Sequence, residues 1–314
     1  MPSKIVSKTP PATPGATPPV RYLIGVDGGG TGTRVRLLSA DGVGLGHGEA
    51  GPSALGQGEE QAWRHILQAV NRAFDSAGLA TAPTLDCALA LGLAGADVLT
   101  RRERFLALAP SFGELLLHSD AQTTLSGAHA GRPGAIVAIG TGSIGLAFGV
   151  DGSRRMSNGW GFPVGDEGSG AWLGLRSMQL AQQALDGRVA TGALARAVFL
   201  VAGSNRAELL AWCEQAGQQR YATLAPLVFE TEAADPQAAA LLARAVLAIE
   251  QTVAAIDPAG TLPLALCGSL GRRFEPRLGA AVRARCVAPA GDAVDGALCL
   301  LRQHLDHHFA RATR

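Results

Sequence analysis

The sequence predicts an α/β protein of two lobes, each with a mixed β-sheet flanked by helices. Its 314 residues suggest two domains, at about 150 residues per domain. Hydrophobic residues make up 47% of the chain and charged residues 17%, so a large core can be buried. A repeated pattern adds to this: both halves open with a strand, a Gly/Thr loop, a strand, an Asp-Gly turn and a strand. The echo indicates a duplicated architecture, although the two sequences are not alike.

The first half begins with strands joined by tight turns and continues with alternating helices and strands. The Asp41-Gly42 pair is a strong hairpin signal. Helical periodicity brings Trp63, Ile66 and Phe74 to one face of a helix. We expect strands at 22–27, 33–39, 43–49, 85–93 and 114–118, and helices at 59–78, 99–108 and 122–130.

The second half repeats this opening and then becomes mostly helical. We expect its strands at 135–139, 144–150, 153–157, 262–267 and 285–288, helices through 170–256, and a final helix at 293–308. Small residues at Ala293, Gly296 and Ala297 favour close helix contact, as an interdomain hinge needs.

These patterns divide the chain into a leader and two lobes. Residues 1–20 are rich in Pro, Thr and Ser, which predicts a disordered leader. One lobe is expected at 21–130, joined by the C-terminal helical segment 293–314. The other is expected at 131–292, with a helical insert.

Composition excludes several functions. The net charge of +1 argues against a nucleic-acid partner. The only lysines are Lys4 and Lys8, so a P-loop, a kinase phosphate lysine and a Schiff-base lysine are excluded from the folded body. The five cysteines form no C-x-x-C pair and indicate buried thiols in a reducing compartment. No stretch approaches about 18 apolar residues, so we expect a cytoplasmic protein without a membrane partner.

The first motif with chemical meaning is Asp27-Gly-Gly-Gly-Thr-Gly-Thr33, between two strands. Glycines remove every Cβ, so backbone N–H groups can line up against phosphate oxygens. Thr31 can add a hydroxyl donor. Asp27, fixed at a strand end, can hold Mg²⁺ directly or through water.

The second motif is Gly140-Thr-Gly-Ser-Ile-Gly145. It matches the dinucleotide-binding pattern G-x-G-x-x-G literally, but that reading needs a helix to follow. Here the next run is apolar and typical of a strand. A second phosphate-binding hairpin fits better.

Three further segments carry candidate residues. Asp120 follows a strand and begins a helix, which is an N-cap signal, and beside two phosphate loops it becomes the candidate general base. The run 158–170 places Asp166 and Glu167 among glycines, with Trp160 as a flat apolar wall. The run 264–271 ends a strand with Gly268-Ser269, where backbone could approach a flat ring such as adenine.

In this order the motifs resemble the BadF/BadG/BcrA/BcrD ATPase family, within the sugar kinase, actin and Hsp70 superfamily. The resemblance runs from about Tyr22 to the C-terminus. It is strongest to bacterial glucosamine and N-acetylglucosamine kinases, and the stretches 168–178, 221–230 and 292–298 look most like glucosamine kinase.

The resemblance implies two ribonuclease-H-like, actin-like ATPase lobes with a nucleotide cleft between them, ATP and Mg²⁺ as cofactors, an amino sugar as substrate, and a homodimer. Asp120 would accept the proton of the sugar 6-hydroxyl. The residues implied for the nucleotide are Gly29, Gly30, Thr31, Thr33, Thr141, Gly142, Gly268 and Ser269. Those implied for the sugar are Ala94, Gly95, Ser119, Asp120, Ser143, Trp160 and Asp166.

The sequence leaves the sugar and the class of activity open. Glucosamine is favoured, because its cationic amine suits Asp166 or Glu167, and N-acetylglucosamine is the alternative. Animal-type N-acetylglucosamine kinases carry a serine where Ala94 stands, which bears on acetamide recognition. An ATP-driven activator with an iron–sulfur cluster would need cysteines near the second loop, where none lies between Cys87 and Cys213. A sugar-responsive regulator is the remaining alternative.

Overall fold

The computed structural model describes residues 20–312, and the side chains of residues 20–307. The expected leader at 1–20 therefore lies almost wholly outside the described residues. The described chain divides into two compact units. The first contains residues up to Arg132 together with those from Pro289 onward, and the second is the continuous segment Pro133–Ala288.

The first unit is built on a mixed sheet with the strand order β3-β2-β1-β4-β5. β1, β2 and β3 pair as antiparallel hairpins, whereas β4 and β5 run parallel to β1. Parallel strands end at the same edge of a sheet, so the carboxyl ends of β1, β4 and β5 lie together. The strands are β1 (Tyr22–Gly28), β2 (Thr33–Ser39), β3 (Gly44–Ala50), β4 (Cys87–Leu93) and β5 (Glu114–Ser119).

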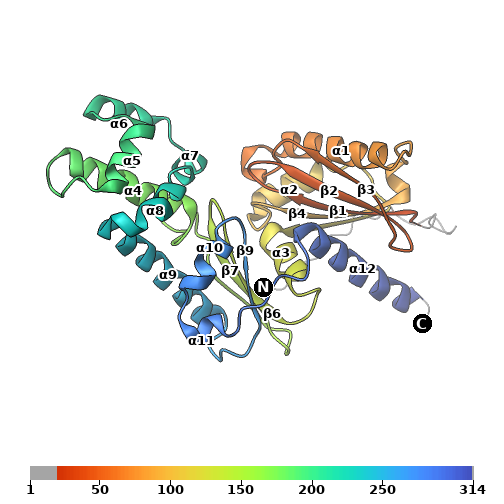
Figure 1. Ribbon diagram of the computed structural model, residues 1–314. Coiled ribbons are helices and arrows are strands. Elements are labelled where there is room, and N and C mark those ends of the chain that lie inside the picture. The colour runs from red at the N-terminus through yellow and green to blue at the C-terminus, as the bar shows by residue number, and fades with distance from the viewer. Residues whose placement is uncertain (1–19, 313–314) are drawn as a thin grey trace. The chain divides into compact units, whose positions relative to one another are not determined.

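Helices cover both faces of this sheet (Figure 1). Successive strand residues face opposite sides, so Ile24 and Val26 join the core under α1, while Leu23 packs with α12. The 3-10 turns are η1 (Leu55–Gln57) and η2 (Thr84–Asp86). The helices are α1 (Glu59–Ser76), α2 (Leu99–Ala107), α3 (Asp120–Ala128) and α12 (Ala293–Ala312).

Glycines allow α12 to pack directly against its neighbours. A Cβ on Gly25 of β1 would lie 2.6 Å from Leu298 Cγ, and one on Gly296 would lie 1.8 Å from the Thr123 carbonyl oxygen of α3. The close contact expected of this helix is therefore present, and its partners are β1 and α3 of the first unit.

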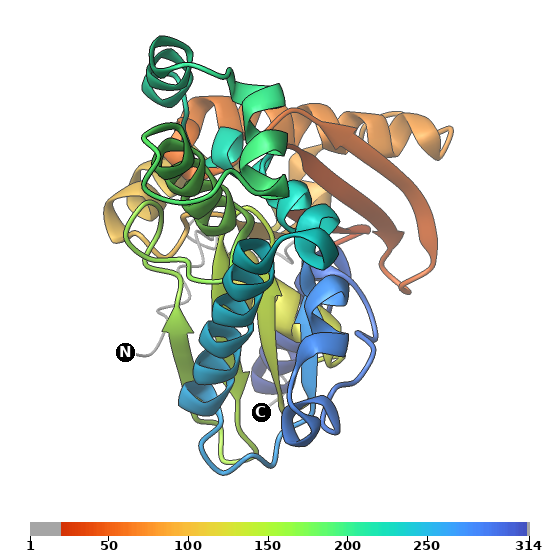
Figure 2. The ribbon, with the colours of Figure 1, turned by 60° about the vertical axis from the view of Figure 1, so that its left-hand side comes forward.

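The second unit contains a smaller sheet, β8-β7-β6-β9, with β9 parallel to β6. The long helix α9 packs on this sheet and contacts β6, β7 and β8 (Figure 2). The strands are β6 (Gly134–Ile139), β7 (Ser143–Phe148), β8 (Arg154–Asn158) and β9 (Leu264–Cys267). The helices are α4 (Gly170–Leu185), α5 (Ala193–Ala202), α6 (Arg206–Glu214), α7 (Gln218–Ala222), α8 (Ala225–Thr231), α9 (Pro236–Ile256), α10 (Gly271–Phe274) and α11 (Ala280–Arg283), with 3-10 turns η3 (Glu232–Ala234) and η4 (Glu275–Arg277).

Two expectations for this unit were wrong. The strand expected at 285–288 is only an isolated bridge between Cys286 and Leu264, because Pro289, which has no N–H, follows directly. The expectation that no segment is long and apolar enough to cross a membrane fails for α9, by length and composition. Yet α9 contributes Leu241, Ile249 and other side chains to the core, which is what a buried core helix does.

Candidate active site

The carboxyl edge of the first sheet gathers several of the predicted residues. In the parallel registers, Asp27 lies opposite Gly92, and Leu93 lies opposite Ser119. The first Gly/Thr loop, the turn after β4 and the start of α3 therefore meet at one edge. A Cβ on Gly92 would lie 2.0 Å from Thr123 Oγ1, so glycine there lets α3 approach β4.

The first loop, residues 28–33, is fixed through its carbonyl oxygens. Gly29 O accepts from the Ser53 and Ala54 N–H groups, both at 3.1 Å. Gly30 O accepts from Gln57 Nε2 at 3.1 Å. Thr31 is exposed, and no atom lies within 4 Å of a Cβ built on Gly29. The loop is thus anchored through its carbonyl oxygens, its Gly29 N–H donates within the loop to Gly32 O at 3.0 Å, and Thr31 is exposed.

Thr33 does not share this open position. It is 1% exposed, and its hydroxyl donates to Gly51 O at 2.6 Å and lies 2.8 Å from Ser53 Oγ. A hydroxyl has one hydrogen to donate. The Thr33 hydroxyl therefore ties the loop to residues 51–53, and a contact of Thr33 with the nucleotide stays a prediction.

Ala94 and Gly95, expected at the sugar, form the turn after β4. Ala94 N donates to Gly28 O, and Ala94 O accepts from Leu55 N, each at 2.9 Å. Gly95 has a φ of 86°, which favours glycine. The turn therefore supports the first loop through its backbone.

Asp120 is the first residue of α3, two residues earlier than the helix was expected to begin. Its Oδ1 accepts the Ala121 N–H at 2.9 Å. Burial raises the pKa of Asp120 to about 6, against the Ala121 hydrogen bond, and the negative charges of Asp27 and Asp97 add to the rise. A pKa near the working pH suits a general base.

Ser119 lies next to this carboxylate. It is 2% exposed, and its Oγ finds no hydrogen-bond partner among the described residues. Buried polar groups are nearly always paired, so such a hydroxyl indicates a position completed by another molecule.

Asp27 has a partner that the sequence did not reveal. Arg34 Nη2 and Nε both donate to Asp27 Oδ2, at 2.5 and 3.2 Å. Within residues 20–307, no hydrogen bond to Oδ1 is present. The pKa of Arg34 is raised, chiefly by its hydrogen bond to Asp27. Only the pairing of β1 with β2 brings these two residues together, since Asp27 lies opposite Arg34 in the register.

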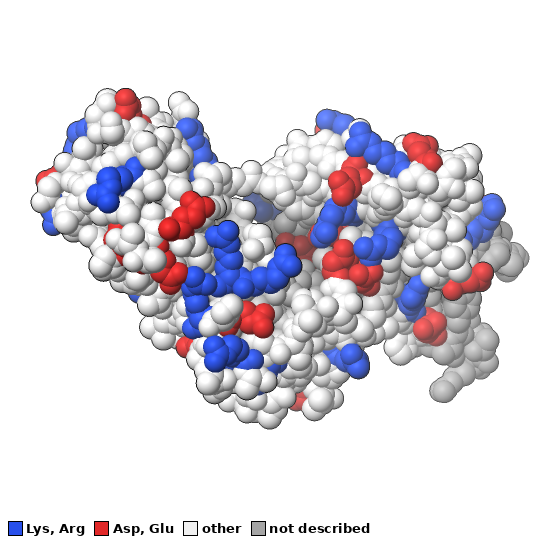
Figure 3. Space-filling model, viewed as in Figure 1, with Lys and Arg blue, Asp and Glu red and all other residues white. Residues whose placement is uncertain are grey.

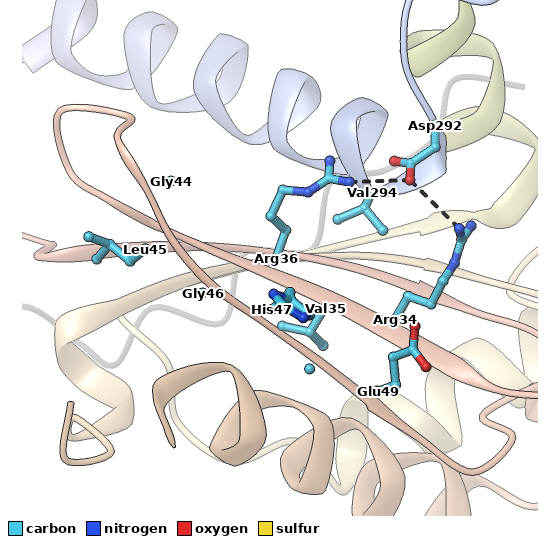
Figure 4. A pocket seen from close by; sticks show the side chains of 11 residues that line it. Arg34, Val35, Arg36, Gly44, Leu45, Gly46, His47, Glu49, Asp292 and Val294 are labelled. Carbon is cyan, nitrogen blue, oxygen red and sulfur yellow. Dashed lines mark hydrogen bonds and ion pairs between the residues drawn. The ribbon is translucent and has the colours of Figure 1, made fainter. Parts of the chain in front are cut away.

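Arg34 also belongs to an ion-pair network at the N-terminus of α12 (Figure 4). Its Nη1 lies 3.7 Å from Asp292 Oδ2, and Arg36 Nη2 lies 3.3 Å from the same oxygen. Arg36 also pairs with Asp295. Burial raises the pKa of Asp292, but the Asp295 N–H and the two guanidinium groups outweigh it and hold the pKa below its ordinary value. An open groove of about 520 Å³ runs beside these side chains, toward His47 on β3.

The residues at this edge fit a magnesium ion. Mg²⁺ in nucleotide sites is usually bound through one or two carboxylates plus phosphate oxygens and water. Asp27 offers Oδ1, and Asp120 is a second carboxylate at the same edge. No cluster of three metal-ligating residues occurs within the described range, so the substrate phosphates would have to complete the coordination.

In the second unit, the loop 140–143 joins β6 to β7 and is held by the start of α4. Gly170 N donates to Gly140 O at 2.8 Å, and Ala171 N donates to Thr141 O at 3.1 Å. Gly268, at φ 81°, lies so close that a Cβ would be 2.4 Å from Ile139 O. Gly268 and Ser269 are both exposed beside this loop. Thr141, Gly142, Gly268 and Ser269 are thus brought together.

Asp166 and Ser143 meet through Asn158, which the sequence did not single out. Asn158 Oδ1 accepts from Asp166 N at 3.1 Å, and its Nδ2 lies 3.5 Å from Ser143 Oγ. Asp166 Oδ1 accepts from Gly161 N at 3.0 Å. Trp160, in contrast, is 88% exposed, so in the second unit it forms no wall against these residues.

The surface charge and the cysteine thiols further restrict the kinds of site that this protein can form. Basic and acidic side chains are interspersed on the face shown in Figure 3, without one extended field of either sign. The cysteines are all unpaired, and burial raises the pKa of Cys87 and Cys267 to about 11. Such thiols are poor metal ligands and nucleophiles.

Comparison with known proteins identifies the family. A profile of the BadF/BadG/BcrA/BcrD ATPase family matches residues 24–262. The chain is 32% identical to the glucosamine kinase of Vibrio cholerae over 280 residues, which cover 89% of this chain and 95% of that protein. It is 49% identical to a Chromobacterium violaceum structure provisionally assigned as an N-acetylglucosamine kinase, with a TM-score of 0.87 and coverage of 90% and 99%.

A more distant structure supports the fold alone. It is a ROK-family glucokinase from Streptomyces griseus, solved with glucose and AMPPNP. It is 16% identical, with a TM-score of 0.50, and the alignment covers 90% of this chain and 99% of that one. These similarities confirm the expected α/β fold of the actin-like, ribonuclease-H-like class. The chain therefore belongs to the BadF/BadG/BcrA/BcrD ATPase family.

Proposed function

We propose that this protein is an ATP-dependent hexosamine kinase that phosphorylates the 6-hydroxyl of D-glucosamine. Two similarities support the activity: the glucosamine kinase relative over nearly its whole length and the closely similar Chromobacterium structure. The observation that carries it is Asp120, a carboxylate with a raised pKa at the edge where the first Gly/Thr loop and Asp27 also lie.

Different residues of this chain would carry the separate parts of the reaction. The sugar 6-hydroxyl oxygen forms a bond to the γ-phosphorus as the bond to the β-phosphate oxygen breaks, and ADP leaves. Asp120 accepts the hydroxyl proton, a role worth about 10²–10⁴-fold. The loops at 28–33 and 140–143 would hold the phosphates through backbone N–H groups. Mg²⁺, held by Asp27 with Asp120 nearby, would neutralise charge developing on the phosphate oxygens.

The absence of lysine after Lys8 makes these groups more important. Residues 9–314 therefore cannot supply the phosphate lysine that other nucleotide-binding folds use. Stabilisation of the transition state must come from N–H groups, arginine and the metal ion.

N-acetylglucosamine remains the second candidate substrate, because the 49% identical structure is provisionally assigned to that activity. A cationic amine favours carboxylates such as Asp166, whereas an acetamide needs a small apolar pocket. We place the reaction in the cytoplasm, with a homodimer as the expected assembly.

A coupled assay of ADP release tests the proposal. We expect glucosamine to stimulate ADP release more strongly than N-acetylglucosamine, glucose or mannose. Asp120→Asn should lower kcat by about 10²–10⁴-fold and leave sugar binding intact. A regulator would bind sugar without turnover in the wild type. If no hexosamine stimulates ADP release, the kinase assignment is wrong.

A further inference from the structure

The backbone at Asp166 is held in an unfavourable conformation around a buried carboxylate. Asp166 has a φ of 61° and is 4% exposed, and Asn158, which accepts its N–H, has a φ of 62°. Non-glycine residues with positive φ are uncommon and persist only where the surroundings hold them. The segment 158–166 is therefore built to present this carboxylate in one place.

A residue from a distant part of the chain completes the arrangement. Gln218, the first residue of α7, donates from Nε2 to Asp166 Oδ2 at 3.1 Å. Because Gly161 N takes Oδ1, each carboxylate oxygen accepts one N–H from the protein. Each oxygen keeps further acceptor capacity, so the carboxylate can still receive hydrogen bonds from a ligand.

The same pair lies against the second Gly/Thr loop. A Cβ built on Gly142 would lie 2.8 Å from Asp166 Oδ2 and 3.4 Å from Gln218 Nε2. Glycine at 142 therefore gives this carboxylate and this amide the room to approach the loop. The carboxylate thus joins the helical insert to a loop that we assign to phosphate binding.

A role in stabilising the fold alone explains the contact between Gln218 and Asp166 less well than a role in ligand binding. A buried carboxylate is a costly way to anchor a five-residue helix, because its charge loses water on burial. That burial raises the pKa of Asp166, which the Gly161 and Gln218 hydrogen bonds partly offset. Tyr221 and Trp212 already fix this region through aromatic packing at 5.2 Å between ring centroids.

We propose that Gln218 is a positioning residue of the sugar site, which holds Asp166 Oδ2 in place for a hydroxyl or amine of the amino sugar. This inference rests on the proposed function. It makes α7 part of the sugar site through Gln218. It also predicts that the Asp166 carboxylate contacts the sugar on one side and the second Gly/Thr loop on the other.

Gln218→Met tests the role, because methionine keeps the length of the side chain and removes the donor. The control is Gln251→Met, the same change at an exposed glutamine of α9 in the same unit. We expect Gln218→Met to raise the Kd for glucosamine, measured by calorimetry without ATP, and the KM for glucosamine, each about 10-fold or more. The KM for ATP should change less than about 2-fold, and the control should match the wild type.

A double-mutant cycle separates positioning from other effects. If Gln218 acts through Asp166, then Gln218→Met should add little to Asp166→Asn, and the double variant should bind glucosamine about as weakly as Asp166→Asn alone. Additive effects would overturn the proposal, as would unchanged sugar binding in Gln218→Met or an equal loss for sugar and ATP with a lower Tm. A wild type that neither binds nor phosphorylates any hexosamine would instead overturn the proposed function, and this assignment with it.

Discussion

At Asp120, burial and the neighbouring negative charges of Asp27 and Asp97 favour the protonated carboxyl. Hydrogen bonds from the Ala121 N–H and, to a smaller extent, from the Asp120 N–H oppose this rise in pKa. A group arranged in this way destabilises the folded protein whenever it is ionised, so its environment is explained by function rather than by stability.

The pH dependence of stability tests this reading. Between the ordinary pKa of 3.8 and the folded value of about 6, the folded protein retains a proton that the unfolded chain loses. Stability attributable to Asp120 therefore falls as pH rises through this window, and the full cost is present above pH 6. Allowing for partial exposure, Asp120→Asn should be more stable than wild type by roughly 1–3 kcal/mol at pH 7.5, with little difference near pH 3.5.

Urea unfolding at both pH values measures the effect. Asp41→Asn, in an exposed turn, is the control and should show no such growing difference. A constant difference between Asp120→Asn and wild type across the range would contradict the raised pKa.

Arg34 offers a second test at the scale of single residues. Its two hydrogen bonds both go to Asp27 Oδ2, while Nη1 forms an ion pair with Asp292, so its loss frees the Asp27 carboxylate to rotate. We expect Arg34→Met to weaken the apparent Mg²⁺ affinity by about 10–100-fold in a titration at saturating ATP, the usual range for residues that orient a metal ligand. Arg36→Met is the matched control, because Arg36 lies on the same strand and pairs with Asp292 and Asp295 but not Asp27. Equal effects of the two substitutions would show that the network acts only on α12.

At the scale of elements, the sequence predicted the features that depend on residues close together in the chain. The hairpins around 28–32 and 140–142, the strand ends and most helices were correctly placed, because glycine loops and hydrophobic periodicity are local signals. Gln218 could not be assigned to Asp166, since the pair is 52 residues apart and meets only through the fold. The loop motif did not reveal that the Thr33 side chain is buried, because the alternation along β2 decides which face of the sheet it occupies.

The contact between α3 and α12 yields a prediction for these elements. A Cβ on Gly296 would lie 1.8 Å from Thr123 O and 2.5 Å from Gly127 N, and both are backbone atoms. Gly296→Ala must therefore push the helices apart, and we expect a loss of about 3 kcal/mol in unfolding free energy. Gly44→Ala is the control, because its nearest neighbour is Leu38 Cδ2 at 3.9 Å. Thermal unfolding of both variants measures this loss. A Gly296→Ala variant as stable as the wild type would mean that α3 and α12 are not in this close contact.

For the whole molecule, the order in which the chain forms the two units determines which segments must come together to complete the first unit. The second unit is one continuous segment inserted into the first, which is completed only by residues after Pro289. The two-lobed α/β class follows from length and the repeated opening pattern. The last helical segment, 293–314, was expected to join the first lobe. Its packing on β1 and β4 depends on Gly25, Ala88 and Ala90, whose small size leaves space for it.

This insertion predicts how fragments of the protein fold. α12 buries Val294, Leu298 and Leu301 against the first sheet. At about 1.5–3 kcal/mol for each large apolar side chain, they contribute roughly 5–9 kcal/mol, which is comparable to the total stability of a domain. Residues 20–132 alone should therefore fail to unfold cooperatively.

Because Ala290 N donates to Ala128 O at 2.9 Å, the two parts of the first unit lie close enough for a short Gly/Ser linker. Residues 20–132 linked to 289–312 should fold, as should 133–288 alone, in circular dichroism and urea unfolding. Cooperative unfolding of 20–132 without α12 would show that this helix is dispensable to the first core.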